Sequence, residues 1–206
     1  MEQMARKQRA SRSEGSEENR SEITRWLQAI SPENTNEAIR TRAFKALMIV
    51  ARKDPDRLLA HWADLDGLLR GGRAFSKFPA VHILAALAPA DDEGRFERSF
   101  RAFFALLEDE AVSVASHVAR LAGEIALAKP ALEPRITRRL LAIDRAQIRP
   151  DRKDLVKAYA LEGFDRYFET TSSKKNILAF AEAMVTSKSP RARKAAKEFL
   201  TSRGAG

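Results

Sequence analysis

Along most of the chain, large apolar residues recur every three or four positions, which is the spacing of an amphipathic helix. This pattern starts near residue 21, and short clusters of Pro, Gly, Ser and acidic residues interrupt it at regular intervals. It predicts about ten helices arranged as five consecutive hairpins. The expected helices cover residues 21–30, 37–53, 54–70, 73–88, 94–107, 111–128, 132–143, 152–168, 174–186 and 190–202.

Apolar positions also recur between the second helices of these hairpins, at a spacing of 35 to 40 residues. Three sets show the recurrence: Phe44, Val81 and Val118; Leu121 and Leu161; and Phe164 and Phe199. Periods in this range are typical of stacked helical hairpins. The helix over residues 73–88 is apolar nearly all round, so we expect it to be the most buried, and Pro79 should kink it or delay its start.

The last predicted hairpin carries the most specific pattern. Its second helix reads Ser-Pro-Arg-Ala-Arg-Lys-Ala-Ala-Lys-Glu-Phe-Leu over residues 189–200. This segment resembles the second helix of a HEAT-like repeat, and weaker versions recur along residues 21–202. The resemblance to HEAT and armadillo-like repeat proteins implies an all-α fold, a right-handed superhelix (alpha-alpha solenoid) of about five hairpins, with the second helices lining its concave face. The alternative is a non-repeating bundle of about ten helices.

Residues 1–20 differ from the rest of the chain because they are polar, mixed in charge and almost without large apolar side chains. Such a segment cannot bury enough surface to offset the entropy lost on ordering. We therefore expect a flexible polar tail over residues 1–20 and a single HEAT-like repeat domain over residues 21–203. The absence of a secretory signal pattern, of a membrane-spanning apolar run and of cysteine predicts a cytoplasmic protein without a membrane span.

The formal net charge of +9 favours anionic partners. Along the chain, the second helices of the five hairpins sum to +10, whereas the first helices sum to zero. A concave face made of second helices would therefore be a basic groove. The alternative is an ordinary solvated surface, in which the two basic terminal helices act as polar caps of the stack.

The candidate binding surface consists of basic and histidine residues of the second helices. Its members are Arg40, Arg42, Lys45, Arg73, Lys77, His82, His117, Arg120, Lys157, Arg191, Arg193, Lys194 and Lys197, and Arg152 and Lys153 share these helices. The pattern predicts a non-enzymatic scaffold that binds a macromolecular partner, an acidic protein, on this face. The alternative partner is DNA or RNA, held through its phosphate backbone with little sequence preference.

Candidate chemistry is sparse. Neither His61, His82 nor His117 has the i, i+4 partner of a helical metal site. His117, Arg120 and Glu124 lie on one helical face, and His82 of the preceding hairpin can approach them. This set predicts a polar ladder between adjacent repeats, with an acid–base couple as the alternative. We predict no catalytic residue, no cofactor and no metal site.

One enzyme class shares the resemblance. Certain alkylpurine DNA glycosylases are built of HEAT-like repeats, which implies a basic concave groove with aromatic residues and a carboxylate. Here Trp26 and Trp62 both fall in first helices, at core-like positions. No catalytic residue of that class can be transferred, so a glycosylase is only the enzymatic extreme of the nucleic-acid alternative.

Overall fold

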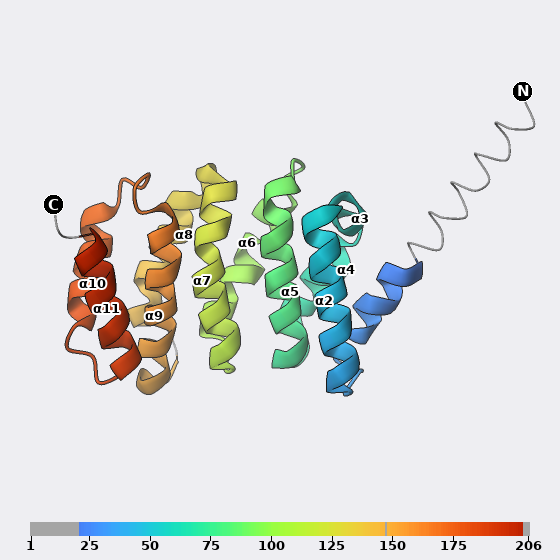
Figure 1. Ribbon diagram of the computed structural model, residues 1–206, viewed down its shortest axis with the longest axis horizontal. Helices are drawn as coiled ribbons and strands as arrows, with labels where there is room; N and C mark the ends of the chain where they lie inside the picture. The colour runs from blue at the N-terminus through green and yellow to red at the C-terminus, as the bar shows by residue number, and fades with distance from the viewer. Residues whose placement is uncertain (1–20, 147, 204–206) are drawn as a thin grey trace, which may run out of the picture.

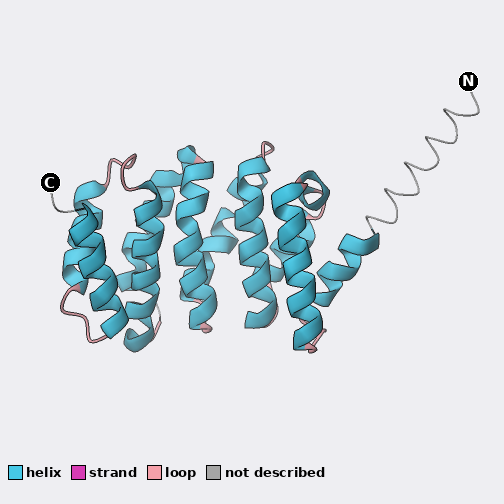
Figure 2. Cartoon of the chain, in the orientation of Figure 1, coloured by secondary structure: helices cyan, strands magenta, loops and turns pink. Residues whose placement is uncertain are grey.

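The computed structural model describes residues 21–146 and 148–203, and all regular secondary structure in these two ranges is helical (Figure 2). The longer elements are a helix over residues 21–29, α2 (Glu37–Lys53), α3 (Asp56–Leu59), α4 (Trp62–Arg70), α5 (Ala74–Leu87), α6 (Arg95–Ala105), α7 (Val112–Ala128), α8 (Glu133–Leu141), α9 (Pro150–Tyr167), α10 (Lys174–Met184) and α11 (Pro190–Arg203). Short 3-10 turns join several of them: η1 (Ala88–Ala90), η2 (Leu106–Glu108), η3 (Pro130–Leu132) and η4 (Ala142–Arg145). The all-α class predicted from the sequence is confirmed.

The helices lie in two layers (Figure 1). Helices α2, α5, α7, α9 and α11 stand side by side in chain order and form what we call the front layer. Helices α4, α6, α8 and α10 lie behind them and form the rear layer. Each front helix contacts the next one along the row, so residues 35 to 40 positions apart become neighbours. The hairpin order predicted from the apolar pattern therefore places the second helices in one layer.

Helix limits agree with the predicted ones to within a few residues, with one break that the pattern did not predict. The helix expected over residues 54–70 is divided into α3 and α4. The division falls at His61, whose φ of −104° and ψ of 18° leave the helical region. The flexible tail predicted for residues 1–20 lies outside the described residues.

Apolar side chains fill the space between the layers, and α5 and α7 each bury more than half of their residues. Val81 and Val118 are fully buried there. Phe44, which the 37-residue spacing groups with these two valines, is only partly buried and packs against Phe78. Helix α5 starts at Ala74 and contains Pro79, so the proline does not delay its start.

Helices α7 and α9 approach each other through two glycines. A Cβ atom at Gly123 would lie 2.3 Å from the carbonyl oxygen of Gly163, and one at Gly163 would lie 2.5 Å from the carbonyl oxygen of Ala119. These distances are far shorter than real Cβ contacts, so only glycine allows the two backbones to come this close. The α7–α9 interface is consequently closed along its centre.

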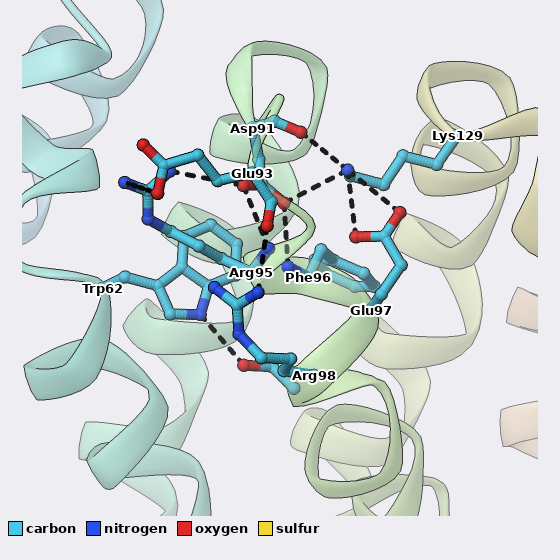
Figure 3. Close-up of polar contacts among 9 residues, drawn as sticks. Trp62, Asp91, Glu93, Arg95, Phe96, Glu97, Arg98 and Lys129 are labelled. Atoms are coloured by element: carbon cyan, nitrogen blue, oxygen red, sulfur yellow. Dashed lines mark hydrogen bonds and ion pairs between the residues drawn. The ribbon is translucent and has the colours of Figure 1, made fainter.

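A buried carboxylate ties the rear layer to the end of α7 (Figure 3). The side chain of Asp91 accepts hydrogen bonds from the backbone N–H groups of Arg95 and Phe96 at the start of α6. Lys129, which follows α7, lies 3.1 Å from Asp91 Oδ2 and also contacts Glu97. Burial alone would raise the pKa of Asp91, but these hydrogen bonds and the ammonium group hold it below its usual value. The charges of Asp91, Glu97 and Lys129 pair with one another, which gives the cluster a structural role.

Both tryptophans also serve the core. Trp62 of α4 is 7% exposed, and its Nε1 donates a hydrogen bond of 2.9 Å to Ser99 Oγ in α6 (Figure 3). Trp26 is partly buried against the hydrophobic core. No described helix combines the length and the apolar character that crossing a bilayer requires.

Candidate functional site

A row of partly buried aromatic and histidine side chains crosses the front layer. Phe44 of α2 contacts Phe78 and His82 of α5, with ring centroids 6.0 and 5.7 Å apart. Phe78 lies 4.7 Å from His117 of α7, and His117 lies 5.9 Å from Tyr159 of α9. The rings therefore link four consecutive front helices at one level of the structure.

The centre of this row is a histidine pair. His82 Nε2 lies 2.9 Å from His117 Nδ1, and a guanidinium nitrogen of Arg120 lies 3.2 Å from the same Nδ1 atom. Because a guanidinium group can only donate, the contact with Arg120 makes His117 Nδ1 an acceptor. The approach of His82 to the His117–Arg120 face, which the repeat spacing suggests, is thus observed.

Both rings are neutral at pH 7. Burial, together with the smaller effects of positive charge at His117, Arg120 and Arg52, lowers the pKa of His82 to about 4. Burial also lowers the pKa of His117, with a second contribution from Arg120. The pair therefore acts as a polar contact between α5 and α7 at neutral pH and carries no charge.

Glu124, the third member of the predicted ladder, forms an ion pair with α9 instead of contacting the histidine pair. Its carboxylate lies 3.8 Å from Arg166 of α9. The histidine pair thus has no carboxylate bound to it among the hydrogen bonds and ion pairs of the described residues. An acid–base couple made of His117 and Glu124 has no direct contact to support it.

A pocket of about 450 Å³ opens between α2 and α5 at one end of this row. Its lining residues are Glu37, Arg40, Thr41, Phe44, Ala74, Phe75, Phe78, Pro79 and Ser113. Phenylalanine rings, proline and alanine make most of the wall, and the polar groups lie among them. We call this hollow the α2–α5 pocket; its volume is in the range of small-ligand and side-chain pockets, about 300–1,000 Å³.

One arginine, Arg40, lines the α2–α5 pocket, and a second, Arg73, lies near its Phe75 wall. The guanidinium of Arg40 lies 4.1 Å from the centroid of the Phe75 ring, and that of Arg73 lies 5.9 Å from it. One nitrogen of Arg40 donates to the backbone oxygen of Asn34. Neither arginine forms an ion pair with a carboxylate within residues 21–146 and 148–203. Their remaining N–H groups can therefore bind an anionic ligand.

Several of the predicted surface residues do come together on the front layer. Arg40 lines the pocket, Arg73 lies near its Phe75 wall, and His82, His117 and Arg120 form the central cluster. Together they place cations and aromatic rings on one continuous strip from α2 to α7.

Two predicted members turn away from this strip. Lys77 forms an ion pair of 2.7 Å with Asp109 and borders a hollow near α4 and α6. Lys157 is 7% exposed, because it lies 2.9 Å from Asp144 and 5.1 Å from the centroid of the Phe180 ring in the rear layer. Both lysines are on front helices but are engaged between repeats.

Arg42 and Lys45 are exposed on α2. Arg42 is two residues from Phe44, which turns it through about 200° to nearly the opposite side of the helix. Arg152 donates to the backbone oxygen of Glu110, and Lys153 donates to that of Asp144. These four side chains do not add to the pocket.

Most basic side chains of α11 already have a hydrogen-bond or ion-pair partner. Arg191 lies 3.1 Å from Glu162 and 4.3 Å from the centroid of the Tyr159 ring. Its cation therefore extends the aromatic row to α11, but a carboxylate already faces it. The stretch with the most specific repeat pattern is not the region with the most available charge.

The neighbouring cations of α11 behave in a similar way. Arg193 donates to the backbone oxygens of Ser187 and Lys188, which closes the loop before the helix. Lys194 lies 3.7 Å from Glu198, one helical turn ahead. Lys197 is exposed. This pattern supports the polar-cap interpretation for α11.

Sequence reasoning missed the phenylalanines of the pocket. Phe75 and Phe78 have helical spacing in an apolar segment, so they resemble core residues. Arg52 was also missed, although its charge acts on His82.

No site in the described part of the chain has the residues of a metal centre: no three His, Asp or Glu side chains gather to hold an ion. A scan against models of known protein families finds no match to this chain, and a search of curated proteins finds no significant match. A functional argument must therefore start from the front layer itself.

Proposed function

We propose that this protein is a non-enzymatic, HEAT-like repeat scaffold that binds an acidic macromolecular partner on the front layer. In this proposal the hairpins form a right-handed superhelix and the front layer is its concave face. The observation that carries the proposal is the pair of arginines at the α2–α5 pocket, Arg40 and Arg73, which lack a carboxylate partner in the described ranges.

The front layer suits such a partner because it combines charge with exposed apolar surface. Arginine fits carboxylates in a bidentate manner and is enriched in protein interfaces together with aromatic residues. The partly buried rings of Phe44, Phe78 and Tyr159 lie beside Arg120 and Arg191 along the same row. A partner lying along this row would meet alternating rings and cations.

Binding of a fluorescently labelled polyglutamate peptide tests the proposal. We expect binding at low ionic strength that weakens as salt is added, because exposed charges are screened. Polyglutamate that does not bind at low ionic strength would refute the proposal. Polylysine of the same length is the matched control for charge and should not bind.

Nucleic acid is the second candidate, and the aromatic row is the observation that favours it. Bases stack on aromatic side chains in basic grooves, and each stacked base contributes about 1–3 kcal/mol. A labelled DNA single strand and a duplex, measured in the same salt series, separate the two candidates. Tighter binding of either DNA than of polyglutamate at equal charge would favour the nucleic-acid function, and release of free base from alkylated DNA would extend it to a glycosylase.

A further inference from the structure

We propose that the α2–α5 pocket is an anchor site for one aromatic side chain of an acidic peptide segment. The inference rests on the proposed function and adds the chemistry of the partner: a short segment of protein in which an aromatic residue is flanked by carboxylates. The aromatic side chain enters the pocket, and the flanking carboxylates bind the arginines at its border.

The wall of the pocket is suited to an aromatic side chain. Phe44 and Phe78 meet edge to face, with an angle of 71° between their rings, and leave an apolar recess beside Pro79. Aromatic side chains bury about 150–250 Å² each and prefer such edge and offset contacts. An incoming ring can therefore pack against both phenylalanines without displacing them.

The border of the pocket is suited to carboxylates. Arg40 lies against one side chain of the wall, the Phe75 ring, at 4.1 Å, and Arg73 approaches the same ring at 5.9 Å. The contact with the ring holds the Arg40 guanidinium at the pocket, and its N–H groups that do not bind Asn34 stay available, as do those of Arg73 nearby. A carboxylate next to the anchoring residue can then form a bidentate pair.

Polar groups at the same pocket favour a peptide over a nucleic acid. Glu37 lines the pocket, and a peptide N–H can donate a hydrogen bond to its carboxylate, whereas an ionised phosphate group has no proton to donate. Pro79 has no N–H to donate to the carbonyl of Phe75, so this backbone acceptor lacks its usual helical donor. Arg40 already covers the Phe75 ring, which leaves that ring unsuited to base stacking.

Two fluorescein-labelled peptides test the inference: Glu-Asp-Glu-Trp-Glu-Asp-Glu and the same peptide with Ala in place of Trp. Fluorescence anisotropy with the full chain gives both affinities. We expect the Trp peptide to bind at least about tenfold more tightly, which corresponds to about 1.4 kcal/mol. Equal affinities, with binding of both peptides retained, would overturn the inference and leave the proposed function standing.

Two variants locate the effect. Phe78→Ala enlarges the pocket and should abolish the preference for the Trp peptide, but it also removes packing against His82 and His117. Thr41→Trp avoids this difficulty, since Thr41 is exposed and a larger side chain there fills the pocket from its rim. Circular dichroism checks that each variant is folded. A preference that survives in folded Thr41→Trp would place the anchor site elsewhere and overturn the inference.

The remaining outcomes separate the inference from the proposed function. If neither peptide nor polyglutamate binds, the proposed function is wrong, and the inference, which rests on it, is wrong as well. If Thr41→Trp weakens the Trp peptide while polyglutamate binding is unchanged, both stand. If a DNA single strand displaces the Trp peptide from the pocket and loses affinity in Thr41→Trp, the pocket serves nucleic acid and the inference is wrong.

Discussion

Two interfaces within the front layer show opposite solutions to the same packing problem. At the α7–α9 interface, Gly123 and Gly163 bring the helices into backbone contact. At the α2–α5 interface, Phe44 and Phe78 face each other, and their size leaves a pocket of about 450 Å³ beside them. The residue at the point of closest approach thus decides whether two neighbouring front helices close against each other or leave a recess.

The two interfaces also differ in whether their basic side chains are paired with carboxylates. Near the α7–α9 interface and α11, cations face carboxylates, as in Arg191–Glu162 and in the contacts of Arg203 with Asp165 and Glu169. The arginines of the α2–α5 interface have no such partner among the described residues. Helices α2 and α11 carry equal numbers of basic residues, but Arg191 and Arg203 of α11 form ion pairs with α9, whereas α2 has no such pair among the described residues.

The largest expected effect comes from opening the closed interface. Gly163→Val puts a branched side chain where a Cβ already lies 2.5 Å from the Ala119 carbonyl oxygen. We expect a loss of about 3 kcal/mol in the free energy of unfolding, measured by urea denaturation. Gly67→Ala is the control, because its Cβ meets nothing within 4 Å, and it should stabilise α4 by about 0.5–1 kcal/mol. Similar results for both variants would show that the interface is not closed.

The second effect concerns the histidine pair between the two interfaces. Folding lowers the pKa of His82 from 6.5 to about 4, so the unfolded chain binds more protons between these values and the folded state loses stability as the pH falls through them. We expect a decrease of about 2 kcal/mol between pH 7 and pH 4, allowing for partial exposure of the ring. Urea denaturation at several pH values measures it.

Two substitutions assign this pH dependence. His82→Gln should remove most of the decrease between pH 6.5 and pH 4, while His61→Gln should leave it intact because His61 belongs to the rear layer beside Asp64. If the two variants respond identically to pH, the histidine pair is not its source.

A third effect compares the two basic regions directly. Arg40→Glu with Arg73→Glu should weaken polyglutamate binding by about tenfold or more, since two available cations become anions. Arg191→Glu with Lys197→Glu makes the same change in net charge, but we expect a loss of less than about threefold, because Arg191 already faces Glu162. Anisotropy at low salt measures both. Equal losses would mean that α11 binds the partner as strongly as α2 and α5.

The smallest effect comes from releasing a paired cation. Glu162→Gln leaves Arg191 without its carboxylate and should raise polyglutamate affinity by about two- to threefold. The stability should change by less than about 1 kcal/mol, since both side chains are about half exposed and exposed ion pairs contribute little. Glu182→Gln, on the rear helix α10, is the matched control and should affect affinity less. A larger gain from the control would contradict the division of charge described above.

Much of the fold could be predicted from the apolar pattern. The helix expected over residues 37–53 is observed as Glu37–Lys53, because its limits are set locally: the Asn36 side chain accepts from the backbone N–H of Ile39 and starts the helix. The contact between His82 and His117 could also be predicted, since a repeat spacing of 35 residues places them on adjacent front helices.

The site was less predictable because it depends on side-chain direction. Phe75 and Phe78 have the spacing of core residues, and nothing local shows that they border a pocket. Lys157 looked available on a front helix, yet it turns to Asp144 in the preceding loop. A helical wheel gives the face of a residue only to within the width of that face, and a long side chain can reach a neighbouring element from its edge.

The sequence by itself determined an all-α chain of consecutive hairpins and a surplus of positive charge in the second helices taken together, because helical periodicity and charge are properties of short segments. Only the tertiary structure decided which of those cations are available. Glu162 and Arg191 are 29 residues apart, and they meet because α9 and α11 pack side by side. Packing also decided that glycine closes one interface while phenylalanine leaves the other open, which places the available arginines and the pocket together at α2 and α5.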